Sequence, residues 1–202
     1  MLFRAACLQP GSTALVHAAA GGLGSALLQL ARSGDITAYG TASAKKHEAV
    51  REDGGIPIDY QSEDFVRRIL ELTNNGGVDA VFDPIGGQNW LRSYRTLRPS
   101  GVLIMNGYQI GLTSGLRGLP LTVLFIGFRK VFPAGRRMMQ VHLSPEKHRD
   151  SYGHDHHILL EMLSKGEIRP RIAATLPLER AAEAHRMLEA GSVTGKLVLL
   201  TE

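Results

Sequence analysis

The chain has 202 residues, of which 44% are hydrophobic and 21% charged, a composition typical of a globular protein with one sizeable core. Its formal net charge of +4 comes from scattered basic residues without a long basic run, which argues against nucleic-acid binding and suits anionic small molecules as ligands. The single cysteine, Cys7, excludes an internal disulfide.

The amino terminus has no secretory signal pattern, because no extended apolar run follows its first arginine. The most apolar window, Leu119–Phe128, has about half of the ~20 residues that a membrane-spanning helix needs. We therefore expect a cytoplasmic protein without an integral membrane span.

Predicted strands and helices alternate through the first half of the chain. An apolar stripe of Leu23, Leu27, Leu30 and Ala31 marks the first helix, and Ser62 is the expected cap of the third. Short glycine-rich turns between the elements favour βαβ crossovers and a mostly parallel α/β sheet. The expected strands are 13–20, 36–43, 56–60, 77–87 and 101–108, and the expected helices are 22–33, 44–53, 62–73 and 89–99.

The alternation stops between residues 109 and 150, where Gly, Pro, Arg and a concentrated apolar run replace the periodic pattern. This range is expected to be an insertion or lobe rather than another βα unit. A helix from residue 157 to near Gly166 and a strand-like stretch follow, then a helix over 178–191 and a final strand at 195–200. The apolar-leaning face of the 178–191 helix comprises Leu178, Ala181, Ala182, His185 and Leu188, with His185 expected to be a hydrogen-bonded packing residue.

The stretch "VHAAAGGLGSALLQLA" (16–31) places a turn of small residues between a strand and a helix. Its spacing, Ala19-x-Gly21-x-x-Gly24, is the dinucleotide-binding fingerprint with alanine in place of the first glycine. Glycines allow a pyrophosphate to approach the backbone N–H groups at the positive end of the helix dipole. The same glycines also serve tight strand-to-helix packing without a ligand, and Ala19 fits only if its φ stays negative.

The end of the second strand, "YGTASAKKHE", has no acid before Glu48. A cofactor without a 2′-phosphate is usually held there by Asp or Glu, whereas hydroxyls and an ammonium group suit a 2′-phosphate. The alternative is that Ser43 caps a helix and that Lys45 and Lys46 are solvated.

Several motifs in order carry a family resemblance: "VHAAAGGLGSALLQLA", "YGTAS…K", "IDYQSEDFVRRILELTNNGGVDAVFDPIGG", "LRPSGVLIMNGY" and "GEIRPRIAATLPLERAAEAHRMLEAGSVTGKLVLL". Together they resemble the zinc-independent quinone oxidoreductase branch of the medium-chain dehydrogenase/reductase superfamily. The resemblance implies a Rossmann-type doubly wound parallel sheet over residues 1–150, which include the insertion at 109–150. It implies that the helix-strand segment at 151–202 packs on this domain and extends into a catalytic lobe.

The same resemblance implies NADPH-dependent reduction of a quinone or an activated alkene such as an enone. It also implies a GroES-like lobe ahead of residue 1, so that this chain is a fragment or the cofactor-binding portion of an enzyme. A homodimer is expected. The implied cofactor contacts are Ala20, Gly21, Gly22, Leu23 and Gly24 at the pyrophosphate, Ser43, Lys46 and Tyr60 at the 2′-phosphate and adenosine ribose, Asp83 to Gly86 lining the cleft, and Gly107 and Tyr108 toward the nicotinamide.

Two points remain open in this assignment. The spacing after Ser43 leaves the choice between Lys45 and Lys46 undecided. No side chain stands out as a catalytic nucleophile, so the catalytic residue is unassigned.

The stretch "HDHHILLE" (154–161) is rich in histidine, and its His157 and Glu161 have helical i, i+4 spacing. A metal site, however, needs three convergent ligands. Solvent-facing histidines at a loop-to-helix junction are the simpler interpretation.

The leading hypothesis is an NADP(H)-linked oxidoreductase or its cofactor-binding portion. The alternative is a non-catalytic NADP(H)-binding or interaction module. A third hypothesis, an S-adenosylmethionine-dependent methyltransferase, predicts an acidic ribose ligand near the second strand, which this sequence lacks.

Overall fold

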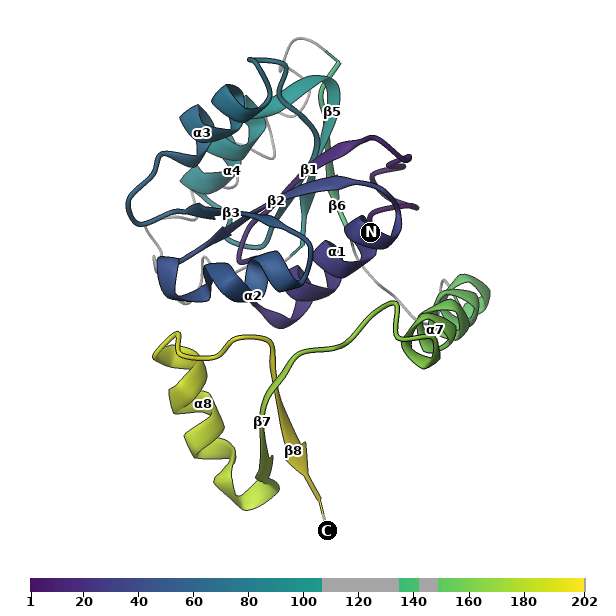
Figure 1. The fold of residues 1–202 in the computed structure, drawn as a ribbon, viewed down its shortest axis with the longest axis vertical. Helices are drawn as coiled ribbons and strands as arrows, with labels where there is room; N and C mark the ends of the chain where they lie inside the picture. Colours follow the sequence, from purple (N-terminus) through teal and green to yellow (C-terminus); the bar gives the residue numbers. More distant parts are fainter. Residues whose placement is uncertain (107–134, 142–148, 202) are drawn as a thin grey trace.

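The computed structural model describes residues 1–106, 135–141 and 149–201. Its main feature is a six-stranded sheet with the order β3-β2-β1-β4-β5-β6, in which every pairing is parallel (Figure 1). This order reverses between β1 and β4, and the carboxyl ends of these two strands form the edge where doubly wound folds bind ligands. The strands are β1 (Thr13–Val16), β2 (Thr37–Ala42), β3 (Ile56–Asp59), β4 (Val78–Asp83), β5 (Leu97–Met105) and β6 (Arg137–Gln140). The predicted Rossmann-type α/β class is therefore confirmed.

Helices cover both faces of the sheet, with α1 and α2 on one side and α3 and α4 on the other (Figure 1). A short 3-10 turn at Ala44–Lys46 precedes α2. Each helix connects two parallel strands, as right-handed crossovers require. The bounds are α1 (Gly22–Ser33), α2 (His47–Glu52), α3 (Phe65–Leu72) and α4 (Gln88–Arg95).

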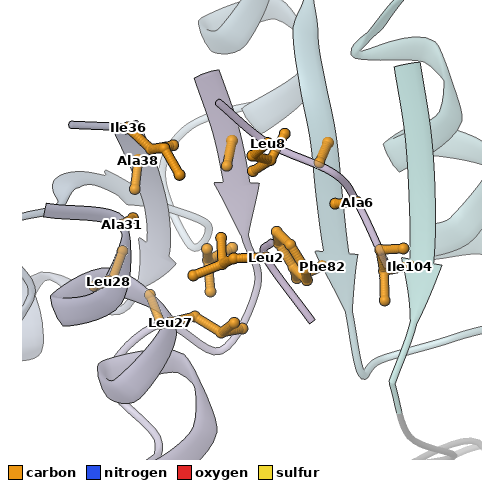
Figure 2. Close-up of a cluster of buried hydrophobic side chains, with 14 of the residues drawn as sticks. Leu2, Ala6, Leu8, Leu27, Leu28, Ala31, Ile36, Ala38, Phe82 and Ile104 are labelled. Carbon is orange, nitrogen blue, oxygen red and sulfur yellow. The ribbon is translucent and has the colours of Figure 1, made fainter. Parts of the chain in front are cut away.

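The α1 face of the sheet packs against a core to which the amino-terminal residues also contribute. Leu2 lies near Leu27 of α1 and Phe82 of β4 (Figure 2), and the same cluster contains Leu8 and Leu28. Leu28 is fully buried, which contributes about 1.5–3 kcal/mol to stability. The predicted α1 stripe was wrong at Leu23, which is 44% exposed, because the first turn packs inward through the next two residues, Gly24 and Ser25, which are buried.

The opposite core is built on Trp90 of α4 and Ile69 of α3, both fully buried. The helix α3 begins at Phe65, later than predicted, because Asp64 rather than Ser62 accepts hydrogen bonds from the N–H groups of Val66 and Arg67. The Ser62 hydroxyl donates instead to Asp59.

The strand β6 corrects the expectation that residues 109–150 contain no further strand of the sheet. Arg137–Gln140 pairs in parallel with Val102–Met105 of β5. The strand escaped prediction because two of its four residues are polar or charged, and only Met138 is buried. The division into residues 1–150 and 151–202 stays a prediction, and most of the expected insertion lies outside the described residues.

The carboxyl-terminal part consists of α7 (Arg149–Ser164) and a small parallel βαβ unit, which lies beside the α1 and α2 side of the main sheet (Figure 1). The helix α7 begins earlier than predicted. The predicted packing face of α8 was wrong: Leu178, Leu188 and His185 are exposed and only Ala184 is buried, since β7 covers just one edge of the helix. The unit comprises β7 (Ile172–Pro177), a 3-10 turn at Leu178–Arg180, α8 (Ala181–Glu189) and β8 (Lys196–Leu200).

Candidate functional site

The glycine turn joins β1 to α1 at the carboxyl edge of the sheet. Gly21 is the N-cap residue, in an extended conformation and without a side-chain capping bond, so the first N–H groups of α1 have no intrahelical partner. A Cβ atom at Gly24 would lie 2.6 Å from the Ala19 Cα and even closer to the Ala18 carbonyl oxygen. Only glycine fits there, and its absent side chain lets the helix start directly against the turn.

Two alanines of this turn, Ala18 and Ala19, differ in burial and in backbone conformation. Ala19 is fully buried, its N–H donates to the Thr41 carbonyl at 3.1 Å, and it lies outside the positive-φ region, so the condition for replacing the first glycine is met. Ala18 is exposed and has a φ of 51°, which is strained for a residue with a Cβ atom. The strain therefore lies one residue before the fingerprint position.

The second anion-binding candidate follows β2. Ser43 is buried and lies at the N-cap of the 3-10 turn, but its hydroxyl makes no capping bond there, which removes the alternative of Ser43 as a cap. Lys45 is exposed, whereas Lys46 is half-buried and its Nζ atom donates to the Val193 carbonyl at 2.6 Å. Burial lowers the pKa of Lys46, and the neighbouring charge of Lys45 lowers it further. Tyr60, just after β3, is 57% exposed, so its ring is accessible to a ligand.

A buried polar network lies beneath the turn. The imidazole of His17 is within 3.0 Å of both the Thr41 hydroxyl and the Ser93 hydroxyl. Ser93 donates to the Asp83 carboxylate at 2.6 Å, so it must accept from the Nε2–H of His17, which leaves Nδ1 to accept from Thr41. Burial lowers the pKa of His17, partly offset by the Asp83 charge. The ring is therefore a neutral packing group rather than a base.

Asp83 organises the turn after β4 through four hydrogen bonds to its carboxylate. One carboxylate oxygen accepts from the N–H groups of Ile85 and Gly86, and the other accepts from Asn89 and Ser93. The carboxylate is fully buried, and the expectation that Asp83 to Gly86 line the cofactor cleft stays a prediction. Its role is to fix the backbone that follows β4.

The sequence reasoning missed a contribution from the carboxyl terminus. Gly195 donates its N–H to the Ala20 carbonyl at 2.8 Å and forms a parallel bridge with Gly21. The stem of Lys196 lies over Gly22, so closely that a Cβ atom there would be 2.6 Å from Lys196 Cγ. This places a lysine side chain beside the start of α1. The "GK" pair was visible in the sequence, but no spacing rule links it to the glycine turn.

The structure thus brings Ala20–Gly24 and Lys46 together through the segment 193–196, with Ser43 beside them at the end of β2. Gly107 and Tyr108 lie outside the described residues. The preceding residue, Asn106, donates its N–H to the Asp83 carbonyl at the end of β4. The contact of Gly107 and Tyr108 with a nicotinamide stays a prediction.

The histidines at 154–157 lie within α7 rather than at its start, and Glu161 pairs with Lys165 at 2.7 Å. Among residues 1–106, 135–141 and 149–201, no three His, Cys, Asp or Glu side chains converge as a metal site would require. In the same residues, no helix is long and apolar enough to cross a membrane.

Comparisons with known proteins fit this geometry. The family model described as "Zinc-binding dehydrogenase" matches residues 55–199. The chain is 36% identical to the synaptic vesicle membrane protein VAT-1 homolog of Rattus norvegicus, covering 99% of this chain and 52% of that protein. It is 31% identical to the 2-haloacrylate reductase of Burkholderia sp, covering 96% of this chain and 57% of that protein. The chain thus spans about half the length of these curated relatives.

Among solved structures, the quinone oxidoreductase of Escherichia coli complexed with NADPH superposes with a TM-score of 0.82 at 26% identity. The alignment covers 99% of this chain and 60% of that structure. The likeness therefore extends through both the main sheet and the carboxyl-terminal unit.

Proposed function

The chain belongs to the zinc-binding dehydrogenase family of the medium-chain dehydrogenase/reductase superfamily, and we propose that it is the NADPH-binding portion of a quinone or activated-alkene reductase. The observation that carries the proposal is the glycine cradle at Gly21–Gly24, where a Cβ atom on any of the three glycines would crowd neighbouring atoms, next to a second strand that is followed by Ser43 and two lysines instead of an acid. A carboxylate at that position would repel a 2′-phosphate, whereas an ammonium group attracts it.

The cofactor contacts follow the order of the elements along the sheet edge. The N–H groups of Gly22, Leu23 and Gly24 would hold the pyrophosphate at the start of α1, with the Ala20 and Gly21 backbone beside them. Ser43 and Lys46 would hold the 2′-phosphate, and Tyr60 would lie along the adenosine ribose. Gly107 and Tyr108 are proposed on the nicotinamide side.

The cradle fits a dinucleotide because the phosphates of the dinucleotide would contact N–H groups and ammonium groups rather than carboxylates. When bound, NADPH supplies the hydride for reduction. The protein's residues would bind and orient this cofactor, while Asp83 and Ser93 keep the turn after β4 in place through their buried hydrogen bonds. The catalytic residue stays unassigned. The described residues do not by themselves make a zinc site, so no step is assigned to zinc.

The substrate proposal is a quinone or an enone. It rests on relatives whose names state quinone oxidoreductase and 2-haloacrylate reductase. A cytoplasmic location and a homodimer stay predictions.

The alternative is a non-catalytic NADP(H)-binding module, favoured by a glycine cradle for which no catalytic side chain has been assigned. Two measurements on one sample separate these functions: NADPH fluorescence on binding, then NADPH oxidation after adding a simple quinone. Binding with turnover supports the reductase, and binding without turnover supports the module. Absence of NADPH binding contradicts both.

A further inference from the structure

The carboxyl-terminal segment Val193–Lys196 runs between the two places proposed to hold the anionic groups of the cofactor. At one end the Val193 carbonyl accepts from Lys46 Nζ at 2.6 Å. At the other end Gly195 is hydrogen-bonded to Ala20 at 2.8 Å, with Lys196 next to Gly22. The segment is therefore attached to the nucleotide-binding domain at both anion sites.

The Lys46 bond has an unusual electrostatic setting. An ammonium group has three N–H donors, so two are left after the bond to Val193. Among the residues that the structure describes, Lys46 forms no ion pair with a carboxylate, and Lys45 adds a second positive charge beside it. Val193 is 9% exposed, so its carbonyl bond lies in a partly desolvated place where a charged donor binds strongly.

We propose that Lys46 is a bridge that couples a 2′-phosphate on the cofactor to docking of the Val193–Lys196 segment. The inference rests on the proposed function. A phosphate would accept hydrogen bonds from the two remaining N–H donors of Lys46. These bonds would fix the ammonium group in the geometry in which it also donates to the Val193 carbonyl. Because binding linkage is reciprocal, the docked segment raises the affinity for NADPH by the same factor by which NADPH favours docking.

The coupling is specific to the phosphorylated cofactor. NADH carries a hydroxyl at that position, which gives Lys46 neither the charge nor the donor arrangement of a phosphate. NADH therefore leaves the Lys46–Val193 bond as it is in the free protein. The carboxyl-terminal unit thereby distinguishes the two cofactors without contacting the 2′-phosphate itself.

The first test needs no cofactor. Hydrogen–deuterium exchange is measured on the full chain, with the Gly195 amide as reporter because its bond to Ala20 exists only when the segment is docked. Lys46→Met is expected to speed this exchange about tenfold, since a hydrogen bond from a charged donor is lost. Lys45→Met is the matched control, because Lys45 is exposed and, in the part of the chain that the structure describes, it is Lys46 that bonds to the segment. Amides of β4 in the same samples report any global loss of stability.

The second test compares NADPH and NADH at equal fractional saturation, which fluorescence establishes for each sample. NADPH is expected to slow exchange at Gly195 at least about threefold beyond NADH, and Lys46→Met should abolish that difference.

The outcomes separate the bridge from the proposed function. If the Gly195 amide exchanges at the same rate in Lys46→Met as in Lys45→Met and the unmodified chain, the bridge is refuted whatever the protein binds. If NADPH binds but protects Gly195 no more than NADH does, the coupling is refuted and NADPH binding stands. Failure of NADPH to bind refutes the proposed function and the coupling together.

Discussion

The Nε2 atom of His17 lies 3.0 Å from the Oγ atom of Ser93, at the point where β1 and α4 meet beneath the glycine turn. Because Ser93 donates to Asp83, the imidazole must present Nε2–H and stay neutral. Three strands of the sheet, β1, β2 and β4, are joined through this one ring and its neighbours Thr41 and Asp83. A buried group of this kind gives the fold a defined dependence on pH.

Stability is expected to fall as the pH drops below about 6.5 because of His17. Burial lowers its folded-state pKa below the unfolded value of about 6.5, so below pH 6.5 the unfolded chain binds a proton that the folded chain does not. The stability is therefore complete above the unfolded pKa and declines as the pH falls toward the folded pKa. Urea unfolding at several pH values measures this decline. His17→Gln should flatten it, whereas His157→Gln, at an exposed position on α7, should leave it unchanged.

Gly24→Ala is expected to destabilise the fold by ~1–3 kcal/mol, because its Cβ atom would overlap the backbone of Ala18 and Ala19. Gly153→Ala is the matched control: it makes the same chemical change within α7, and a Cβ atom there meets no atom within 4 Å. This variant should be more stable by about 0.5–1 kcal/mol, since alanine favours a helix. Equal effects in denaturant titrations would contradict the close packing of the turn.

Lys46→Glu is expected to weaken NADPH binding about tenfold to a hundredfold while changing NADH binding much less, because a carboxylate repels the 2′-phosphate. Fluorescence titration with both cofactors measures this. Lys45→Glu is the control at the neighbouring exposed position. Equal losses for the two cofactors would refute the 2′-phosphate assignment, and a larger loss in Lys45→Glu would move it to Lys45.

Lys196→Ala is expected to weaken NADPH and NADH by the same factor, about fivefold, because a pyrophosphate is common to both. The prediction rests on the position of the Lys196 stem over Gly22 at the start of α1. Lys165→Ala, which removes an exposed lysine paired with Glu161, should change neither affinity. A loss confined to NADPH would show that the Lys196 amine reaches the 2′-phosphate instead.

Much of the main sheet could be predicted from the sequence because its βα units are local. The strand, glycine turn and helix over residues 13–33 follow from short-range patterns, and the alternation over 13–105 leads to the parallel sheet. Boundaries were less accurate: Asp64 replaced Ser62 as a cap because several nearby polar side chains were able to accept the same N–H groups. The strand β6 was missed because its alternation is too weak to stand out.

The sequence by itself determined where an anion is predicted to bind, since Gly21, Gly24 and the acid-free end of β2 are properties of neighbouring residues. Only the tertiary structure decided what borders that site. Lys46 and Val193 are 147 residues apart in the chain, and no local pattern encodes their 2.6 Å bond. Gly22 is a second example. The sequence shows that this residue is a glycine, but only the structure shows that the side chain beside it is that of Lys196, which belongs to the distant βαβ unit. Contacts between distant segments depend on the summed packing of the whole fold rather than on the preferences of either segment.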